Sequence, residues 1–386
     1  MCLMFPDPSS IPLSVYIHLP WCVQKCPYCD FNSHAVRGTL PEEAYIAALL
    51  SDFKEAYPLL NKRPVCSIFL GGGTPSLFSA HGVGQILNGI HQQTHFDPDI
   101  EITLEANPGT VDSAAFSGFR AAGINRLSIG IQSLQDDKLK QLGRIHGRLD
   151  ALKAIETAKK AGFDNFNLDL MHGLPGQTAE DAEADLLDAL ATDPTHLSWY
   201  QLTLEPNTLF HARPPILPDE DTLHSIQSAG QSVLNQAGFT AYEVSAWARD
   251  SRHCLHNRNY WEFGDYLGIG AGAHSKLTTE NASLLRRAQC KHPTDYLNAT
   301  KRLAAKWQRV PETEIAFEFM LNALRLTEGV PARFFEERTG LPLSSIAEPL
   351  AEAHQKNLLR KDPTHLCASA LGQQFLNDLT ALFLPA

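Results

Sequence analysis

Hydrophobic and polar positions recur in a fixed order along the first 210 residues of this chain. Short runs rich in β-branched and aromatic residues are each followed by a turn and then by a stretch with helical periodicity. This order is typical of βα units. The predicted strands are 13–18, 65–70, 100–105, 125–131, 165–171 and 196–204. The predicted helices between them include 42–57, 112–122, 149–161 and 178–191. Six such units do not complete an eight-stranded barrel, and parallel strands with crossover helices are the economical interpretation.

The pattern changes after about residue 205. A proline-rich stretch, 212–221, leads into a predicted helix at 219–237, and two β-like runs at 239–247 and 266–275 follow. We interpret this part as an extension packed on the barrel. From Pro311 onward the pattern is helical, with a predicted wing near 357–367, as in a winged-helix-like domain. The predicted domains are 1–210, 211–310 and 311–386.

Composition and charge argue against a nucleic-acid-binding, membrane-spanning or secreted protein. The 386 residues include 32 Lys and Arg against 43 Asp and Glu, which gives a net charge of -11. A negative field repels nucleic acid, so no nucleic-acid partner is expected. No window approaches the run of about 18 apolar residues of a membrane span, and residues 1–12 lack the basic start and apolar run of a signal peptide. We therefore expect a cytoplasmic protein without a transmembrane segment.

Three of the eight cysteines are clustered. Cys22, Cys26 and Cys29 fall within eight residues, and the other five are scattered singly. In a cytosolic chain such clustering indicates a metal site rather than a disulfide. No second cysteine pair completes a tetrahedral zinc set, whereas a [4Fe–4S] cubane held by three thiolates keeps one iron free for a small molecule. The alternatives are a structural cluster completed by Cys66, His18 or Asp30, or three ordinary core cysteines.

Polar and glycine-rich residues follow the predicted strands at their carboxyl ends, where parallel βα folds build their sites. The cysteine loop follows the first strand, and the loops after the next four strands begin near Gly71, Glu105, Gln132 and Asp169. Five consecutive loops are therefore expected to face one mouth. The glycine run after the second strand fits either a polar ligand or a tight structural turn.

The segment YIHLPWCVQKCPYC (16–29) resembles the signature of radical S-adenosylmethionine (SAM) proteins. The resemblance continues through GGGTPS, EANPG, GIQS, LGRIH and DLMHGLPGQ, and so covers about the first 210 residues. Within that family, the sequence is most similar to the branch that contains the oxygen-independent coproporphyrinogen dehydrogenases and the HemW-type heme chaperones. This resemblance implies an α/β fold, the incomplete (β/α)6 barrel. It also implies that Cys22, Cys26 and Cys29 hold the cluster, whose open iron binds SAM and cleaves it to a 5′-deoxyadenosyl radical.

The same resemblance assigns a SAM pocket. Carboxylates, an amide and an arginine at strand ends can bond ribose, amino and carboxylate groups, although each alone also fits a capping or surface residue. Tyr16 is expected next to the cluster and Tyr28 beside the adenine. The full set is Tyr16, Tyr28, Gly72, Gly73, Thr74, Glu105, Gln132, Arg144 and Asp169. Whether one or two SAM molecules bind is left open.

A second motif, HNRNYW (256–261), fits the HNxxYW pattern associated with the heme chaperones. Neutral imidazole is an axial ligand of heme iron, and aromatic rings stack on a flat macrocycle. The predicted heme residues are His256 as ligand, with Asn257, Tyr260 and Trp261. His253 and Cys254 are alternative ligands, and a packed, hydrogen-bonded corner is the alternative to a heme site.

One departure separates the two activities of this branch. The dehydrogenases carry a further cysteine two places after the third ligand, whereas this chain has Asp30 and Phe31 there. The sequence therefore predicts a heme chaperone that delivers heme to an acceptor such as a respiratory apoprotein, with an electron donor as a further partner. A homodimer and SAM cleavage are left open. The alternatives are oxidative decarboxylation of coproporphyrinogen III and a radical SAM reaction on another substrate, including RNA.

Overall fold

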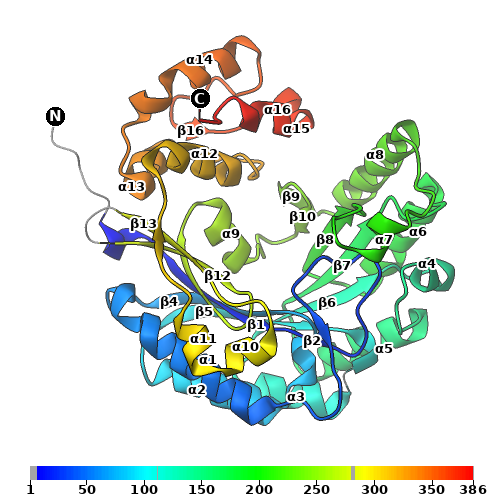
Figure 1. Ribbon diagram of the computed structural model, residues 1–386. Coiled ribbons are helices and arrows are strands. Elements are labelled where there is room, and N and C mark those ends of the chain that lie inside the picture. The colour runs from blue at the N-terminus through cyan, green and yellow to red at the C-terminus, as the bar shows by residue number, and fades with distance from the viewer. Residues whose placement is uncertain (1–6, 111, 280–282, 386) are drawn as a thin grey trace.

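The computed structural model describes residues 7–110, 112–279 and 283–385. Its centre is one sheet in the order β14-β13-β12-β11-β1-β4-β5-β6-β7-β8-β10-β9, which Figure 1 shows with helices along its outer face. Six neighbouring strands form its parallel middle: β1 (Leu13–Leu19), β4 (Val65–Gly72), β5 (Phe96–Ala106), β6 (Arg126–Gln132), β7 (Phe166–His172) and β8 (His196–Gln201). These are the six predicted strands, so the incomplete (β/α)6 barrel is confirmed.

Crossover helices cover the outside of this parallel sheet. The crossovers are α1 (Glu42–Ala56), α2 (Ala80–His91), α3 (Ser113–Ala122), α4 (Asp136–Gln141), α5 (Arg148–Lys160) and α6 (Ala179–Leu190). The sequence places α6 well because Thr178 and Asp181 form a capping box at its start. The strands bury apolar side chains on the face toward these helices, as Val15, Ile17 and Leu70 show. The opposite face carries buried polar side chains such as Ser14 and Thr103.

The sheet continues beyond the six units at both edges. β11 (Asp265–Ile269) lies parallel to β1, and β12 (His274–Thr278), β13 (Leu284–Ala288) and β14 (Gln308–Arg309) follow antiparallel. At the other edge, β10 (Ala246–Ala248) and β9 (Thr240–Glu243) are antiparallel to β8 and to each other. The predicted extension is present, and it continues the barrel sheet itself instead of packing on its surface. The run 266–275 also splits in two where Gly270 and Gly272 adopt positive φ.

The HNRNYW segment forms a helix, α9 (Leu255–Trp261), where the sequence predicted only a connection between β runs. Glu101 explains its position, because this buried carboxylate accepts the backbone N–H groups of Leu255 at 3.0 Å and His256 at 3.2 Å. A carboxylate satisfies the unpaired donors at a helix N-terminus. The helix contacts β4, β1 and β11, on the opposite side of the sheet from α1 and α2 (Figure 1).

The C-terminal helices have their own apolar core and lie above α9 in Figure 1. They are α12 (Glu312–Ala323), α13 (Arg333–Thr339), α14 (Ala347–Gln355), α15 (Ala370–Gln374) and α16 (Leu376–Ala381). β15 (Val330–Pro331) pairs with β16 (His365–Leu366), and Leu359 bridges to Ala368, where the wing was predicted. The domain boundaries at 210 and 310 stay a prediction.

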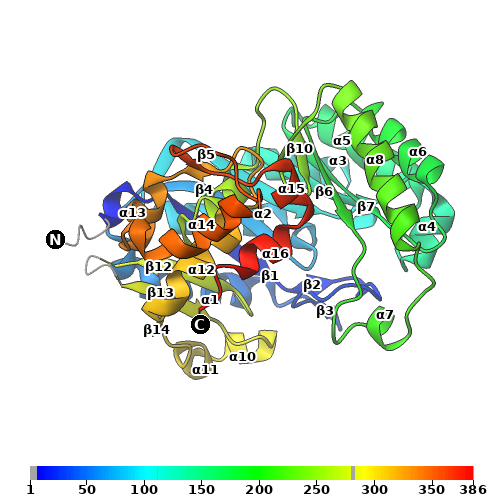
Figure 2. The ribbon, with the colours of Figure 1, turned by 90° about the horizontal axis from the view of Figure 1, so that it is seen from above.

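Short elements surround the cysteine loop. β2 (Trp21–Cys22) pairs with β3 (His34–Ala35), and Phe210 N donates to Pro27 O at 3.0 Å, which places α7 (Leu209–Ala212) beside the loop (Figure 2). The remaining helices are α8 (Glu220–Gln236), α10 (Pro293–Leu297) and α11 (Ala299–Leu303).

Candidate functional site: two adjoining cavities at the strand ends

The cysteine loop is closed at its base and lines a cavity. The β2–β3 pair joins the two ends of the loop, and Trp21 packs edge-on against Tyr45 at 4.7 Å between ring centroids. Cys22, Cys26 and Cys29 are free thiols that line one chamber of about 370 Å³. We call it the cysteine chamber. In residues 7–110, 112–279 and 283–385 no three metal-ligating side chains already meet as a metal site.

The glycine run holds this loop against β4. A Cβ on Gly73 would lie 2.5 Å from the carbonyl oxygen of Trp21, and one on Gly72 would lie 2.5 Å from the His18 ring. Gly72 also has φ +117°, which favours glycine. Gly72, Gly73 and Thr74 all line the cysteine chamber. The glycine run therefore serves both as a tight structural turn and as part of a ligand cavity, because the close approach that glycine permits also forms the chamber wall.

Two partly buried carboxylates line the chamber. Glu105 Oε2 accepts the N–H of Gly72 at 3.0 Å, and Asp169 accepts Ser128 Oγ at 3.0 Å and Asn167 Nδ2 at 2.8 Å. Burial, with the charge of Asp169, raises the pKa of Glu105 to about 8. Burial also raises the pKa of Asp169. Carboxylates that line a cavity and have raised pKa values are typical of a ligand site.

Arg144 brings a cation next to the cysteines. Its guanidinium donates to Cys26 Sγ at 3.5 Å, to the carbonyl oxygen of Gly130 at 2.7 Å and to the Asn107 side chain. Its buried Nε has no hydrogen-bond partner among the described residues. The Arg144 cation therefore lies directly beside the thiols of the chamber. The donor set, the open space and this arginine therefore fit a cluster with an anionic ligand group beside it.

Most predicted SAM residues meet in this chamber. Tyr28, Gly72, Gly73, Thr74, Glu105, Gln132, Arg144 and Asp169 all line it. Tyr200, which the sequence analysis did not single out, also lines it and donates to Gln132 Oε1 at 2.7 Å. The sequence could have identified Tyr200, because it lies near the carboxyl end of the sixth predicted strand. The other site residues were selected for the same position after their strands.

Tyr16 is the exception. Its hydroxyl bonds to His18 Nδ1 at 2.9 Å, and it lines a second cavity instead of the cysteine chamber. Tyr16 and His18 are two apart on β1, so both project from the same face of the strand. His18 Nε2 contacts the carbonyl oxygen of Asn32 at 2.8 Å, so both ring nitrogens of this proposed fourth ligand are occupied.

The second cavity, which we call the aromatic cavity, has a volume of about 620 Å³. It adjoins the cysteine chamber, and the two share Phe31, Gly72 and Glu105. The aromatic cavity is lined by Tyr16, His18, Phe31, Asn32, Gly72, Glu105, Tyr260, Trp261, Phe263, Gly264, Tyr266, Gly272, His274, Lys276, Arg286, Lys291 and Asn322. Phe31, at the position where the dehydrogenases carry cysteine, is 60% exposed and lies at the boundary of the two spaces.

The HNxxYW residues divide between this cavity and the core. Tyr260 and Trp261 line the cavity. His256 is 1% exposed, and its ring nitrogens contact Ser67 Oγ at 3.0 Å and Tyr260 Oη at 2.8 Å. Burial lowers the pKa of His256 to about 3. Iron could bind this imidazole only after one of these hydrogen bonds broke, and Asn257 does not line the cavity.

The alternative heme ligands, Cys254 and His253, and the alternative cluster ligands, Cys66 and Asp30, also lie outside both cavities. Cys254 is 1% exposed and donates to Glu101 at 3.5 Å, and His253 stacks on Tyr242 at 4.3 Å. Cys66, at the amino end of β4, is six residues from Gly72, about 20 Å of strand. Asp30 is exposed and lines neither space.

Comparisons with known proteins agree with this geometry. The Radical SAM superfamily model matches residues 16–189, and the HemN C-terminal domain model matches residues 310–375. The chain is 49% identical to "Heme chaperone HemW" of Haemophilus influenzae, with 98% of this chain and 99% of the relative covered. It is 47% identical to "Heme chaperone HemW" of Escherichia coli, with 97% and 98% covered.

A solved structure supports the fold. The chain superposes on coproporphyrinogen III oxidase (HemN) of Escherichia coli, described as a radical SAM enzyme, with a TM-score of 0.81 over 97% of this chain and 90% of that chain. At 22% identity this likeness concerns the fold alone. The strand-end chamber, the matched family model and the 47–49% identity to two relatives over nearly the whole length lead to one conclusion: the chain belongs to the radical SAM superfamily and, within it, to the HemW family.

Proposed function

We propose that this protein is a heme chaperone, which binds heme and delivers it to acceptor apoproteins, and that it holds a [4Fe–4S] cluster and SAM. The observation that carries this proposal is the 47–49% identity, over nearly the whole length, to two relatives named heme chaperone HemW. The aromatic cavity supports it, because its space and aromatic lining suit a flat macrocycle.

In this proposal Cys22, Cys26 and Cys29 are the cluster ligands, since they share one chamber. The cluster supplies one-electron chemistry to a SAM molecule bound beside it. Around this pair, Arg144 balances thiolate charge, and the chamber wall at Gly72, Gly73 and Thr74 accepts a ligand at close range. The proposed polar contacts to SAM are Tyr28, Glu105, Gln132, Arg144 and Asp169.

The dehydrogenase reading is less well supported. Phe31 occupies the place of the extra cysteine of the dehydrogenases, and its ring lines both cavities. The likeness to HemN extends to the fold alone. An anaerobic assay with coproporphyrinogen III, SAM and a reductant separates the two readings, because a chaperone forms no protoporphyrinogen.

The heme acceptor, the electron donor and the cellular location are also proposals. We propose a respiratory heme protein as the acceptor, a separate electron donor, and a cytoplasmic location. Among the described residues, no helix has the length and apolar character needed to cross a membrane. A homodimer is compatible with this proposal and is tested by sedimentation with and without heme.

The function is tested by transfer of heme. Cluster-loaded protein is charged with one equivalent of heme under anaerobic conditions and mixed with an apo-cytochrome, and the acceptor's absorbance spectrum is followed. The proposal expects saturable heme binding followed by reconstitution of the acceptor. A protein that binds no heme at stoichiometric concentration would contradict it.

A further inference from the structure

We infer that the aromatic cavity is the heme site and that His274 of β12, rather than a residue of the HNxxYW motif, is the axial ligand of the iron. This inference rests on the proposed function, because it names the place where that function holds its cargo. The argument follows from the lining of the cavity, the state of each side chain that could ligate iron, and the charges around it.

His274 has the free imidazole of this cavity. It is exposed, it lines the cavity, and its ring makes no hydrogen bond with the described residues, whereas His18 is bonded at both nitrogens. Partial desolvation, followed by the charges of Arg286 and Lys291, lowers its pKa. Both effects favour the neutral imidazole, which is the form that binds iron.

The tyrosine hydroxyls and the buried lysine that line the cavity are engaged. The hydroxyls of Tyr16, Tyr260 and Tyr266 contact His18, His256 and Arg286, respectively. The Lys276 ammonium lies 2.9 Å from Asp265 and bonds to two backbone carbonyl oxygens. Iron binding at any of these would break an existing hydrogen bond, which His274 does not require.

The aromatic wall fits the macrocycle. Tyr260 meets Tyr266 edge-on at 4.5 Å and Trp261 at 6.4 Å between centroids. Phe31 contributes an exposed ring from the cysteine loop. A porphyrin is flat and apolar over both faces, and aromatic side chains supply matching apolar area. The motif helix α9 therefore contributes the wall, while its His256 fixes that wall by bonding Tyr260.

The cavity also has the charge that heme propionates require. Among the described residues, its basic side chains are Lys276, Arg286 and Lys291, and Glu105 is the one carboxylate that lines it, in a protein with a net charge of -11. Arg286 is paired with Glu318, and Lys276 with Asp265. The exposed Lys291 forms no ion pair with the described residues, so it is the cation best placed to pair with a propionate.

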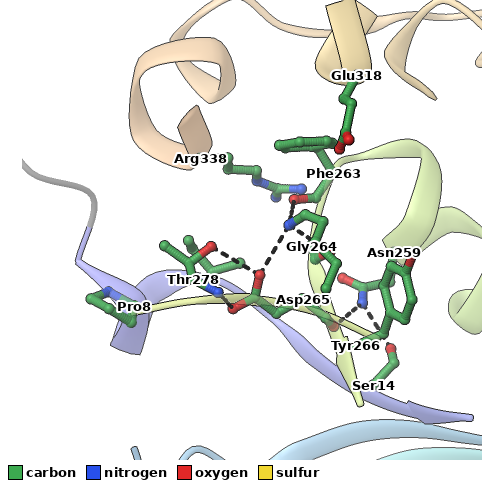
Figure 3. Close-up of polar contacts among 12 residues, drawn as sticks. Pro8, Ser14, Asn259, Phe263, Gly264, Asp265, Tyr266, Thr278, Glu318 and Arg338 are labelled. Carbon is green, nitrogen blue, oxygen red and sulfur yellow. Dashed lines mark hydrogen bonds and ion pairs between the residues drawn. The ribbon is translucent and has the colours of Figure 1, made fainter. Parts of the chain in front are cut away.

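The wall near these cations is held by buried polar contacts. Asp265 accepts Thr278 N at 2.8 Å and also pairs with Arg63 and Lys276. Asn259 Nδ2 donates to Ser14 Oγ and to the backbone oxygen of Asp265 at 2.8 and 2.9 Å, as Figure 3 shows. The cavity is therefore preformed, and an iron ligand can be changed at His274 without disturbing this network.

The experiment is an anaerobic titration of cluster-loaded protein with ferric heme, followed by the Soret band. His274→Ala should weaken binding at least about tenfold and change the band, and added imidazole should restore the wild-type band in His274→Gly. His81→Ala, an exposed histidine of α2 outside both cavities, is the matched control and should bind as wild type does. Lys291→Glu should weaken binding of heme but not of its dimethyl ester.

The remaining outcomes distinguish a wrong ligand assignment from a wrong proposed function. Unchanged affinity and spectrum in His274→Ala would overturn the assignment and leave the chaperone function intact, since the wild-type protein binds heme. Failure of the wild-type protein to bind heme would instead refute the proposed function. If the His274→Ala protein keeps its heme and loses one of two bound SAM molecules, the cavity is a second SAM site and the inference is wrong.

Discussion

The cysteine chamber and the aromatic cavity adjoin each other but are built differently. In the cysteine chamber the motif residues themselves face the open space, and Cys22, Cys26 and Cys29 have few protein partners. In the aromatic cavity the motif histidine is buried and bonded at both nitrogens, and only Tyr260 and Trp261 of the motif reach the space.

The difference shows that a motif can serve chemistry or architecture. Ligands to a metal cluster must face the cluster, so in the proposed function the spacing of the cysteines points directly to the ligand atoms. A cargo cavity needs walls as well as ligands, and a helix such as α9 can be fixed by its polar residues while its aromatic residues do the binding. Five predictions test this contrast, from the largest expected effect to the smallest.

Cys26→Ala should abolish the cluster, because no fourth thiol lines the chamber among the described residues. Iron and sulfide analysis after anaerobic reconstitution should fall to background. Cys66→Ala, at the amino end of β4, is the control and should keep full iron content. If Cys26→Ala kept the iron and sulfide content of the wild-type protein, the cysteine motif would not supply the cluster ligands, and the contrast with the HNxxYW motif would no longer hold.

Asp265→Asn should lower the free energy of unfolding by about 3–5 kcal/mol, because it leaves the buried cations Arg63 and Lys276 without their counter-ion. Denaturant unfolding checks this, with the exposed Asp164→Asn as a control that should behave as wild type does. An unchanged unfolding midpoint would show that the cavity wall is not held by this network.

The same carboxylate predicts a pH dependence. Its cationic partners overcome the cost of burial and lower the pKa of Asp265. A lowered folded pKa stabilises the fold fully above the unfolded value of about 3.9, and this contribution is lost as pH falls through the folded pKa. The stability difference between wild type and Asp265→Asn should therefore shrink below about pH 4.

Gly73→Ala should weaken SAM binding about thirtyfold, close to 2 kcal/mol, because the new Cβ would displace the Trp21 backbone and with it the cysteine loop. Equilibrium dialysis with SAM measures the effect. Gly84→Ala in α2 meets its nearest atom at an ordinary 3.7 Å and serves as the control. Equal SAM affinity in both variants would mean that the loop does not depend on this close approach.

His256→Ala should cost about 1–2 kcal/mol of stability, because Ser67 and Tyr260 lose a hydrogen-bond partner. Its heme affinity should stay within a few-fold of wild type, in contrast to His274→Ala. Thermal unfolding and heme titration on the same samples give both quantities. A large loss of heme affinity at unchanged stability would make His256 the ligand after all.

The sequence predicted the barrel and the cysteine chamber well, because both depend on local patterns. Strand periodicity and the strand-end rule brought residues as distant as Cys22 and Asp169 into one chamber. The aromatic cavity was not predicted, because it forms where β12, α9 and the cysteine loop meet. The ring nitrogens of His256 are occupied by Ser67 and Tyr260, and the bond to Ser67, 189 positions away, has no local signature. His274, in a run predicted as one strand, had no motif to single it out.

The most direct test of this account is a crystal structure of the cluster-loaded protein with heme, with anomalous difference maps recorded at the iron edge. The account predicts two separate iron sites: the cluster beside Cys22, Cys26 and Cys29, and a single iron next to the His274 ring, with the porphyrin against Tyr260 and Trp261. A heme iron bound to His256, or a heme outside the aromatic cavity, would contradict it.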